Sequence, residues 1–412
     1  MSDAALLKIK QQRKLRKFIA KLVSCSPFYQ RFEPDIKSFP VMNKASFLHN
    51  FADLNQSGVA LETATELALR AERERNFSPV IAGGITVGLS SGTSGKRHVF
   101  LVSRADRCRW AGQMLGRMLT RASLLRVINP FAKPLKIAFF LRANSNLYTT
   151  LASSRVDFAY YDLTKSFHGL VEEVTRQQPH LLVAPATVLA ELARARVSIR
   201  PQQVISVAEV LDDRDRAQIE EAFGIRVAEI YQAAEGFLGC SCEHGRVHLN
   251  EDSLHVEPLW LDEERSRFHP IITDFSRSAQ WFVRYQLDDI LRVNPVACPC
   301  GRATTSLYAV EGRVSEVLWL RSQSGELSPV FPDALRQAIY GMVEPPEMYR
   351  VEQHGDVWEI RLRNGDEKCV TAAFEQLIAG LELIAPTLVF LPWTDQASTE
   401  KQKRFHCVNK PT

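Results

Sequence analysis

The feature that most constrains this chain is an alternation of short apolar runs with longer amphipathic stretches. The apolar runs have the length of strands and the stretches between them have helical periodicity. In chain order these segments are residues 136–141, 156–161, 165–177, 181–184, 203–208 and 212–223. Because strands that alternate with helices are typical of α/β proteins, the middle of the chain is predicted to form an α/β body.

The pattern changes on the C-terminal side of Glu235. Short strands and turns follow, with residues 281–285 and 290–293 extended, and they predict a β-rich subdomain. The end of the chain has the pattern of a small α+β unit. A chain of 412 residues is long enough for two or three such units.

Charge and hydropathy exclude several classes of partner. The net charge is only +4, which is too small a surplus to predict nucleic-acid binding, and the basic residues 8–21 fit an amphipathic helix. The sequence has no run of about 18 apolar residues that could span a membrane. The N-terminus lacks the apolar core of a signal peptide, so we expect a cytoplasmic protein with reduced cysteines.

A glycine-rich segment follows the β-like run 86–89. Glycines allow backbone N–H groups to approach phosphate oxygens, hydroxyls donate further hydrogen bonds, and a lysine adds positive charge. The residues are Ser90, Ser91, Gly92, Thr93, Ser94, Gly95 and Lys96. The segment is not a P-loop, because Ser90 replaces the first glycine and Arg97 replaces the hydroxyl residue after the lysine. Composition alone would also allow a flexible surface turn.

This segment resembles the phosphate loop of the adenylate-forming superfamily, and further motifs of that family follow in the same order. Residues 205–210 resemble the segment that lies against adenine, with Ala208 and Glu209 at its centre. Residues 223–236 resemble the strand and turn that carry a tyrosine and a glutamate, here Tyr231 and Glu235. Residues 284–290 resemble the motif whose aspartate binds the ribose hydroxyls.

Other motifs are similar to those of the phenylacetate-CoA ligase-like branch. They are the N-terminal residues 26–32 and 39–44, the P-C-G-R run 299–302, the V-E-G-R run 310–313, the V-F-P run 330–332 and the basic run 398–404. The resemblance covers nearly the whole chain. It implies an ATP- and carboxylate-binding domain over residues 1–312 and a small mobile lid domain over residues 313–412.

The resemblance also assigns roles. The residues at 90–96 hold phosphates, Tyr231 stacks on adenine and Glu235 holds Mg²⁺. Asp289 binds the ribose, although the adjacent Asp288 is a rival for that role, and Arg313 reaches the ribose or a phosphate. Lys401 takes the place of the catalytic lysine, although residues 401–404 could also be an ordinary solvated basic tail.

The implied activity is ATP-dependent conversion of a carboxylic acid to an acyl adenylate, with release of pyrophosphate. The acid is expected to be aryl or hydroxyaryl, and the acceptor a thiol of coenzyme A or of phosphopantetheine on a separate carrier protein. Two alternatives remain: an adenylyltransferase that stops at an AMP conjugate, and a catalytically decayed ligand-binding homologue. The altered hinge at Ser315 would tolerate the first alternative. The second is motivated by the missing proline after the phosphate loop and by the departures from the family pattern at Ala234, Ser315 and Glu400. The oligomeric state is left open.

Three cysteines and one histidine form a candidate zinc site, and one of the cysteines, Cys300, belongs to the P-C-G-R run. Cys242, His248, Cys298 and Cys300 offer three thiols and an imidazole, enough for a closed tetrahedral site that would be structural. Cys240 or His244 could replace one of them. The alternative is a set of buried free cysteines with a hydrogen-bonded histidine.

Overall fold

The computed structural model describes residues 3–74, 76–81, 83–89, 98–141, 150–394 and 404–411. The chain forms two compact units. The first contains Met1–Leu287 and Arg292–Ala309, and the second contains Asp288–Leu291 and Val310–Thr412. The chain therefore passes between the units within strands β13 (Asp289–Val293) and β14 (Leu307–Arg313). The division into moving domains after Gly312 stays a prediction.

The N-terminal part of the first unit is helical. Helix α1 (Ala4–Cys25) begins at Asp3, whose side chain accepts a hydrogen bond from the Leu6 N–H, and its apolar face buries Leu15, Ile19 and Leu22. These side chains belong to a core that also includes the following short helices and the first hairpin. Those elements are η1 (Tyr29–Arg31), η2 (Ile36–Ser38), α2 (Lys44–His49), α3 (Leu61–Arg73), β1 (Thr86–Leu89) and β2 (Val99–Val102).

A seven-stranded sheet with the order β4-β3-β5-β6-β7-β8-β9 forms the α/β body. Strands β3 to β7 are parallel, whereas β8 and β9 are antiparallel additions. The strands are β3 (Leu135–Leu141), β4 (Val156–Asp162), β5 (Leu181–Ala184), β6 (Gln203–Ser206), β7 (Val227–Ala233), β8 (Gly236–Ser241) and β9 (Val247–Leu249). The α/β fold predicted from the alternating pattern is confirmed.

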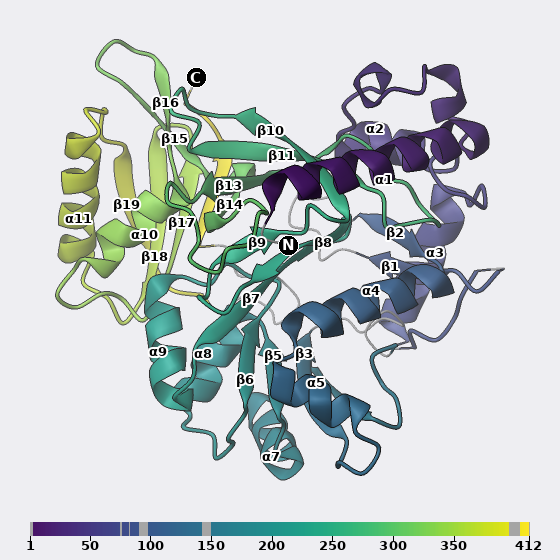
Figure 1. Ribbon diagram of the computed structural model, residues 1–412. Helices are drawn as coiled ribbons and strands as arrows, with labels where there is room; N and C mark the ends of the chain where they lie inside the picture. The colour runs from purple at the N-terminus through teal and green to yellow at the C-terminus, as the bar shows by residue number, and fades with distance from the viewer. Residues whose placement is uncertain are drawn as a thin grey trace. The chain divides into compact units, whose positions relative to one another are not determined.

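Helices cover both faces of this sheet (Figure 1). Alternate residues of a strand point to opposite faces, so Ile137 packs in one core and Ala138 in the other. Helices α4 (Arg104–Met118) and α5 (Arg121–Ile128) lie on the first face. The second face is covered by α7 (Phe167–Gln177), α8 (Ala186–Arg194) and α9 (Asp213–Phe223). Burial on both faces explains why the sequence shows continuous apolar runs here.

The β-rich part of the first unit follows the sheet. Strand β10 (Leu254–Trp260) pairs antiparallel with β11 (Arg267–Asp274), and β12 (Tyr285–Gln286) pairs with β11. None of the helices in the described ranges has the length and apolar character needed to cross a bilayer.

The second unit is a small α+β structure, as the sequence predicted. Its sheet has the order β19-β18-β17-β20, and its core includes Trp358 of β18 and Phe374 of α11. The elements are η3 (Val314–Glu316), β15 (Leu318–Arg321), β16 (Leu327–Val330), α10 (Pro332–Tyr340), β17 (Met348–His354), β18 (Val357–Arg363), α11 (Glu367–Gly380), β19 (Thr387–Leu391) and β20 (Phe405–Asn409).

Candidate nucleotide and metal sites

The predicted adenine and magnesium residues of the first unit follow two neighbouring parallel strands. Ala208 and Glu209 come after the end of β6, and Tyr231 and Glu235 lie near the end of β7. Ligands of open α/β sheets bind outside the carboxyl ends of the strands. The structure therefore brings these two motifs to the edge of the sheet where a ligand is expected.

The turn after β6 has an unusual backbone. The sequence predicted a strand over residues 203–208, but β6 ends at Ser206 and Ala208 has a φ of 66°. This left-handed conformation is costly for alanine and ends the strand. The Glu209 carboxylate accepts hydrogen bonds from the Thr187 N–H (3.0 Å) and hydroxyl (2.8 Å) at the start of α8. The side chain of Glu209 therefore caps a helix, and a nucleotide role for this turn falls to its backbone.

Tyr231 lies at an irregularity between β7 and β8. It pairs with Gly239, and the register then shifts before Gln232, which pairs with Phe237. Such bulges redirect side chains and are common beside active sites. A Cβ atom at residue 239 would lie 2.7 Å from the His248 carbonyl oxygen, so the close approach of β8 and β9 requires glycine opposite Tyr231. Tyr231 itself is half-buried against the core of the first unit.

Glu235, in the turn between β7 and β8, is buried and contacts a histidine. Its Oε1 lies 3.0 Å from Nδ1 of His98, and only 3% of His98 is exposed. The imidazole packs edge-on against Phe47 and stacks on Tyr285, with ring centroids 5.3 and 5.7 Å away. The sequence did not identify His98, although it stands two residues after the predicted phosphate loop.

The flanks of that loop are fixed. Leu89 pairs with Val99 in the β1–β2 hairpin, and His98 contacts Glu235. Residues 90–96 themselves lie outside the described residues, as does Lys401. The two ends of the loop, and through His98 the glutamate turn, are thus held by one hairpin.

A buried arginine supports the glutamate turn. Arg277 donates hydrogen bonds to the carbonyl oxygens of Ala234 (2.8 Å) and Leu101 (3.0 Å). Burial lowers the pKa of Arg277, while the carboxylates of Asp274, Asp106 and Glu235 act in the opposite direction. The guanidinium thus lies among three acidic groups, and its hydrogen bond to Ala234 fixes the backbone beside Glu235.

The pKa values of the two other carboxylates beside Arg277, those of Asp106 and Asp274, are shifted in opposite directions. Burial disfavours the charged form of Asp106, but hydrogen bonds from Ala279, Ser278 and Ser103 outweigh it and lower the pKa of Asp106. Burial raises the pKa of Asp274. An added Cβ at residue 236 would lie 2.8 Å from an Asp274 carboxylate oxygen, which explains the glycine after Glu235. The sequence did not identify this acidic cluster, although Ser103 and Asp106 have the spacing of a capping box, which the structure shows.

In the second unit, the predicted ribose residues lie together. Arg313 Nε is 3.5 Å from Asp289 Oδ1, and both side chains are partly exposed. Asp288, the rival candidate, is exposed to solvent. Ser315, in the place of the family's hinge aspartate, lies in the single turn η3 directly after β14.

The predicted zinc ligands form one cluster within the first unit. One ligand atom from each of Cys242, His248, Cys298 and Cys300 lies within 4.8 Å of the others. The Cys242 and Cys298 sulfurs are 3.6 Å apart, and Cys300 Sγ is 3.4 Å from His248 Nε2. Cys240 is buried in the sheet core, where burial raises its pKa, and it is not part of this cluster.

Similarity to known proteins is found among solved structures. No family model and no curated protein sequence matches the chain. Among solved structures, 2-hydroxyisobutyryl-CoA ligase with 2-HIB-AMP in the postadenylation state is similar over 97% of this chain and 88% of its own, with 16% identity and a TM-score of 0.67. The chain has the fold of the adenylate-forming ligases.

Two other solved structures share this fold over a smaller part of the chain. The o-succinylbenzoate CoA synthetase of Bacillus subtilis, in complex with its acyl-adenylate OSB-AMP, has a TM-score of 0.55 and 13% identity, covering 77% of this chain and 68% of its own. ATP-bound MatB from Rhodopseudomonas palustris has a TM-score of 0.53 and 11% identity, covering 78% of this chain and 66% of its own.

Proposed function

We propose that the chain activates a carboxylic acid with ATP, forming an acyl adenylate and releasing pyrophosphate, and then transfers the acyl group to a thiol. The observation that carries this proposal is the contact between Glu235 and His98. It links two family motifs that are more than a hundred positions apart in the sequence, because His98 lies two residues after the predicted phosphate loop and Glu235 ends the tyrosine-glutamate motif. The fold shared with ligases that form acyl adenylates supports the same activity.

The chemistry requires an anionic carboxylate to attack an anionic α-phosphate in line. The protein must therefore align two reactants and reduce their repulsion. In the proposed mechanism, residues 90–96 hold the β- and γ-phosphates through backbone N–H groups and Lys96. Tyr231 stacks on adenine, and the backbone at Ala208 and Glu209 lines the base.

Glu235 is the proposed magnesium ligand. Its carboxylate is a hard oxygen donor, which suits Mg²⁺. A bound Mg²⁺ would neutralise charge on the phosphate oxygens. His98 and Arg277 hold the glutamate turn in place while this charge is bound.

Asp289 is proposed to accept hydrogen bonds from the ribose hydroxyls, with Arg313 beside it on the ribose or a phosphate. The 3.5 Å separation between Arg313 Nε and Asp289 Oδ1 supports a shared role for the two side chains. Lys401 is proposed to neutralise the charge that develops between the carboxylate and the α-phosphate. These assignments rest on the resemblance of residues 284–290, 310–313 and 398–404 to the family motifs.

The proposed substrate is an aryl or hydroxyaryl acid, as expected for the phenylacetate-CoA ligase-like branch. The proposed acceptor is coenzyme A or the phosphopantetheine of a separate carrier protein. Acid-dependent exchange of labelled pyrophosphate into ATP tests the first half-reaction. The panel should contain aryl, hydroxyaryl, fatty and short hydroxy acids, because 2-hydroxyisobutyryl-CoA ligase shares the fold. If no acid supports exchange, the catalytically decayed alternative is favoured.

Lys401→Ala tests the catalytic lysine against an ordinary basic tail. We expect the variant to lose most of the exchange activity while ATP binding, measured by calorimetry, stays nearly intact. Lys403→Ala, two positions away, is the matched control and should retain activity. An unaltered adenylation rate in Lys401→Ala would reject the assignment.

A second candidate activity is transfer of AMP to an acceptor without thioester formation. The residue that favours it is Ser315 in η3, because it lacks the carboxylate that the family has at the hinge. Mass spectrometry of products separates the two: a thioester with coenzyme A or a carrier supports the ligase, and a stable AMP conjugate supports the transferase.

A further inference from the structure

We propose that Cys242, His248, Cys298 and Cys300 bind one structural Zn²⁺, which fastens the β8–β9 hairpin to the connection between β13 and β14. This inference goes beyond the proposed activity, because no step of carboxylate activation uses the site. Cys242 and His248 stand at the two sides of the hairpin, whereas Cys298 and Cys300 lie in the connection, residues 294–306.

The distances fit a single small ion. Zinc–sulfur bonds of 2.3 Å and zinc–nitrogen bonds of about 2.0 Å in a tetrahedron place ligand atoms about 3.5–3.8 Å apart. The measured separations are 3.6 Å between the Cys242 and Cys298 sulfurs and 3.4 Å between Cys300 Sγ and His248 Nε2. The sulfur–sulfur separation is far longer than a disulfide bond of about 2.05 Å. Three thiolates and one imidazole are a common ligand set of structural zinc.

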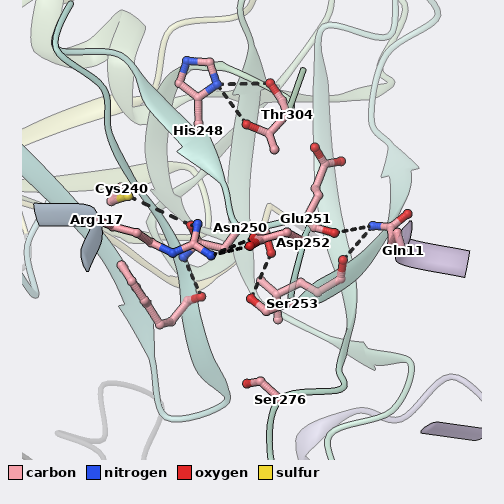
Figure 2. A network of polar contacts seen from close by, with 12 residues as sticks. Gln11, Arg117, Cys240, His248, Asn250, Glu251, Asp252, Ser253, Ser276 and Thr304 are labelled. Atoms are coloured by element: carbon pink, nitrogen blue, oxygen red, sulfur yellow. Dashed lines mark hydrogen bonds and ion pairs between the residues drawn. The ribbon is translucent and has the colours of Figure 1, made fainter. Parts of the chain in front are cut away.

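The orientation of His248 is that of a metal ligand. Its Nδ1 lies 3.1 Å from the Thr304 carbonyl oxygen, which can only accept a hydrogen bond, so the neutral ring carries its proton on Nδ1. The lone pair is then on Nε2, the atom that faces Cys300. Metal-binding histidines usually donate their second N–H to a carbonyl or carboxylate in this way. Figure 2 shows the imidazole with Thr304.

Backbone N–H groups point at two of the sulfurs. The His244 N–H donates to Cys242 Sγ and the Arg302 N–H donates to Cys300 Sγ, each over 3.4 Å. Both bonds come from the residue two positions later, in turns where Gly245 and Gly301 have φ values of 79° and 69°. Such bonds stabilise negative charge on sulfur and favour the thiolate form that zinc requires.

The charges around the cluster also suit three thiolates. Zn²⁺ with three thiolates and a neutral imidazole has a net charge of −1. Arg246 donates to the carbonyl oxygens of Val296 and Ala297 beside Cys298, and Arg302 forms an ion pair of 3.5 Å with Glu243. These two arginines bring positive charge close to the ligand set.

The connection that holds Cys298 and Cys300 has little apolar support of its own. Its branched aliphatic residue, Val296, is 64% exposed. The connection is nevertheless ordered against the turn after β9, since Leu249 N–H donates to the Thr305 carbonyl and Glu251 accepts from the Thr305 N–H at 2.6 Å. A segment that cannot bury apolar surface is the kind that a metal stabilises.

That turn is itself anchored to helices from elsewhere in the first unit. Arg117 of α4 binds the Asp252 carboxylate with two contacts of 2.7 and 2.8 Å and the Asn250 side chain at 2.7 Å. Gln11 of α1 donates to the Glu251 and Leu254 carbonyl oxygens (Figure 2).

All four positions of a tetrahedral ion would be filled by protein, so no position remains for water or substrate. The site is therefore structural and not catalytic. Replacement of Zn²⁺ by Co²⁺ should leave the pyrophosphate-exchange rate unchanged. The colour of cobalt bound to thiolates in a tetrahedral field would report the ligand set independently of any activity.

The first experiment is metal analysis of the full chain purified without chelators. We expect about one zinc per chain, falling in Cys298→Ser and Cys300→Ser. The exposed Cys369 on α11 provides the matched control, Cys369→Ser, which should retain the metal. Less than about 0.2 zinc per chain, with no uptake on adding Zn²⁺, would overturn the proposal.

A second measurement uses the parent chain alone, in case the ligand variants do not fold. A mercurial reagent is titrated in the presence of a coloured zinc indicator. We expect zinc release to follow the modification of three protected thiols among the eight cysteines. Uniform reaction of all eight thiols without zinc release would contradict the site. Neither readout needs the carboxylate-activating reaction, so failure of one proposal is distinguishable from failure of the other.

Discussion

Strand β8 joins two polar clusters of different chemistry. Glu235 directly precedes the strand and Cys242 directly follows it. At the first end, a carboxylate is held by His98 and lies near a buried arginine. At the second end, sulfur atoms and an imidazole converge at 3.4–3.6 Å. Six residues thus separate a group of oxygen donors from a group of soft donors.

This difference in donor atoms indicates that the two clusters would bind different metal ions for different purposes. Carboxylates suit Mg²⁺, which keeps water and phosphate ligands and leaves with them, whereas thiolates suit Zn²⁺ enclosed entirely by protein. The first cluster would be open to substrate and the second closed. The comparison predicts that changes at one end of β8 affect catalysis and changes at the other affect stability.

The largest effect is expected for Glu235→Gln. The substitution keeps the size of the side chain but removes the negative charge proposed to bind Mg²⁺. We expect acid-dependent pyrophosphate exchange to fall about 10²–10³-fold, as when one electrostatic contact of a transition state is removed. The zinc content should stay unchanged, since the thiol cluster lies at the other end of β8.

Glu221→Gln, on the exposed side of α9, is the control for this change and should retain exchange activity. Normal pyrophosphate exchange in Glu235→Gln would contradict the proposed catalytic role of the cluster at the Glu235 end of β8. Loss of zinc together with activity would show that the two ends of β8 are not independent.

Gly239→Ala tests the strand itself. The new methyl group would lie 2.7 Å from the His248 carbonyl oxygen, which is backbone and cannot move aside cheaply. We expect the free energy of unfolding, measured with urea, to fall by about 1–3 kcal/mol. Exchange activity and zinc content should both decrease, because β8 and β9 would separate.

Gly112 on α4 provides the matched control, since a Cβ there meets no atom within 4 Å. Gly112→Ala should stabilise the helix by about 0.5–1 kcal/mol. If Gly239→Ala were equally harmless, the close packing of the two strands would not be a determinant of either cluster.

Substitutions of His98 are expected to have a smaller and more local effect on the free energy of unfolding. His98→Ala leaves the buried Glu235 carboxylate without its imidazole partner, which we expect to cost about 1–3 kcal/mol of unfolding free energy. His98→Asn places an amide N–H near the position of Nδ1 and should recover part of the loss. Equal destabilisation by both substitutions would show that ring packing, and not the hydrogen bond, is what matters.

The smallest effect is expected at Asp106 and depends on pH. Its lowered pKa means that the ionised carboxylate stabilises the folded state above the unfolded pKa of about 3.9. The stabilisation is lost as the pH falls through the still lower folded pKa. Asp106→Asn should therefore cost about 1 kcal/mol at pH 7 and progressively less below pH 4. A difference that is constant with pH would contradict the role of the charge.

The sequence predicted the elements whose pattern depends on burial. Residues 86–89 and 181–184 form β1 and β5 with the predicted limits. All four residues of β5 are buried, as expected for a continuous apolar run in a sheet covered on both faces. The predicted strand 203–208 was too long, since the left-handed backbone at Ala208 is not encoded by its side chain.

The residues of the polar sites were predicted less completely than the strands. Glu235 was found from its motif, but its partners His98 and Arg277 come from distant segments and carry no pattern of their own. The sequence could not choose between Cys240 and the other cysteines as ligands. The structure places Cys240 in the sheet core and the exposed His244 outside the cluster, where its N–H donates to Cys242.

The sequence by itself determined the α/β class and the kinds of donor atom available, because burial periodicity and ligand chemistry are properties of residue order and type. Only the tertiary structure decided which donors meet. A strand turns neighbouring side chains to opposite faces and a tight turn reverses the chain, so residues such as His98 and Glu235, or Cys242 and Cys298, become partners through folding alone.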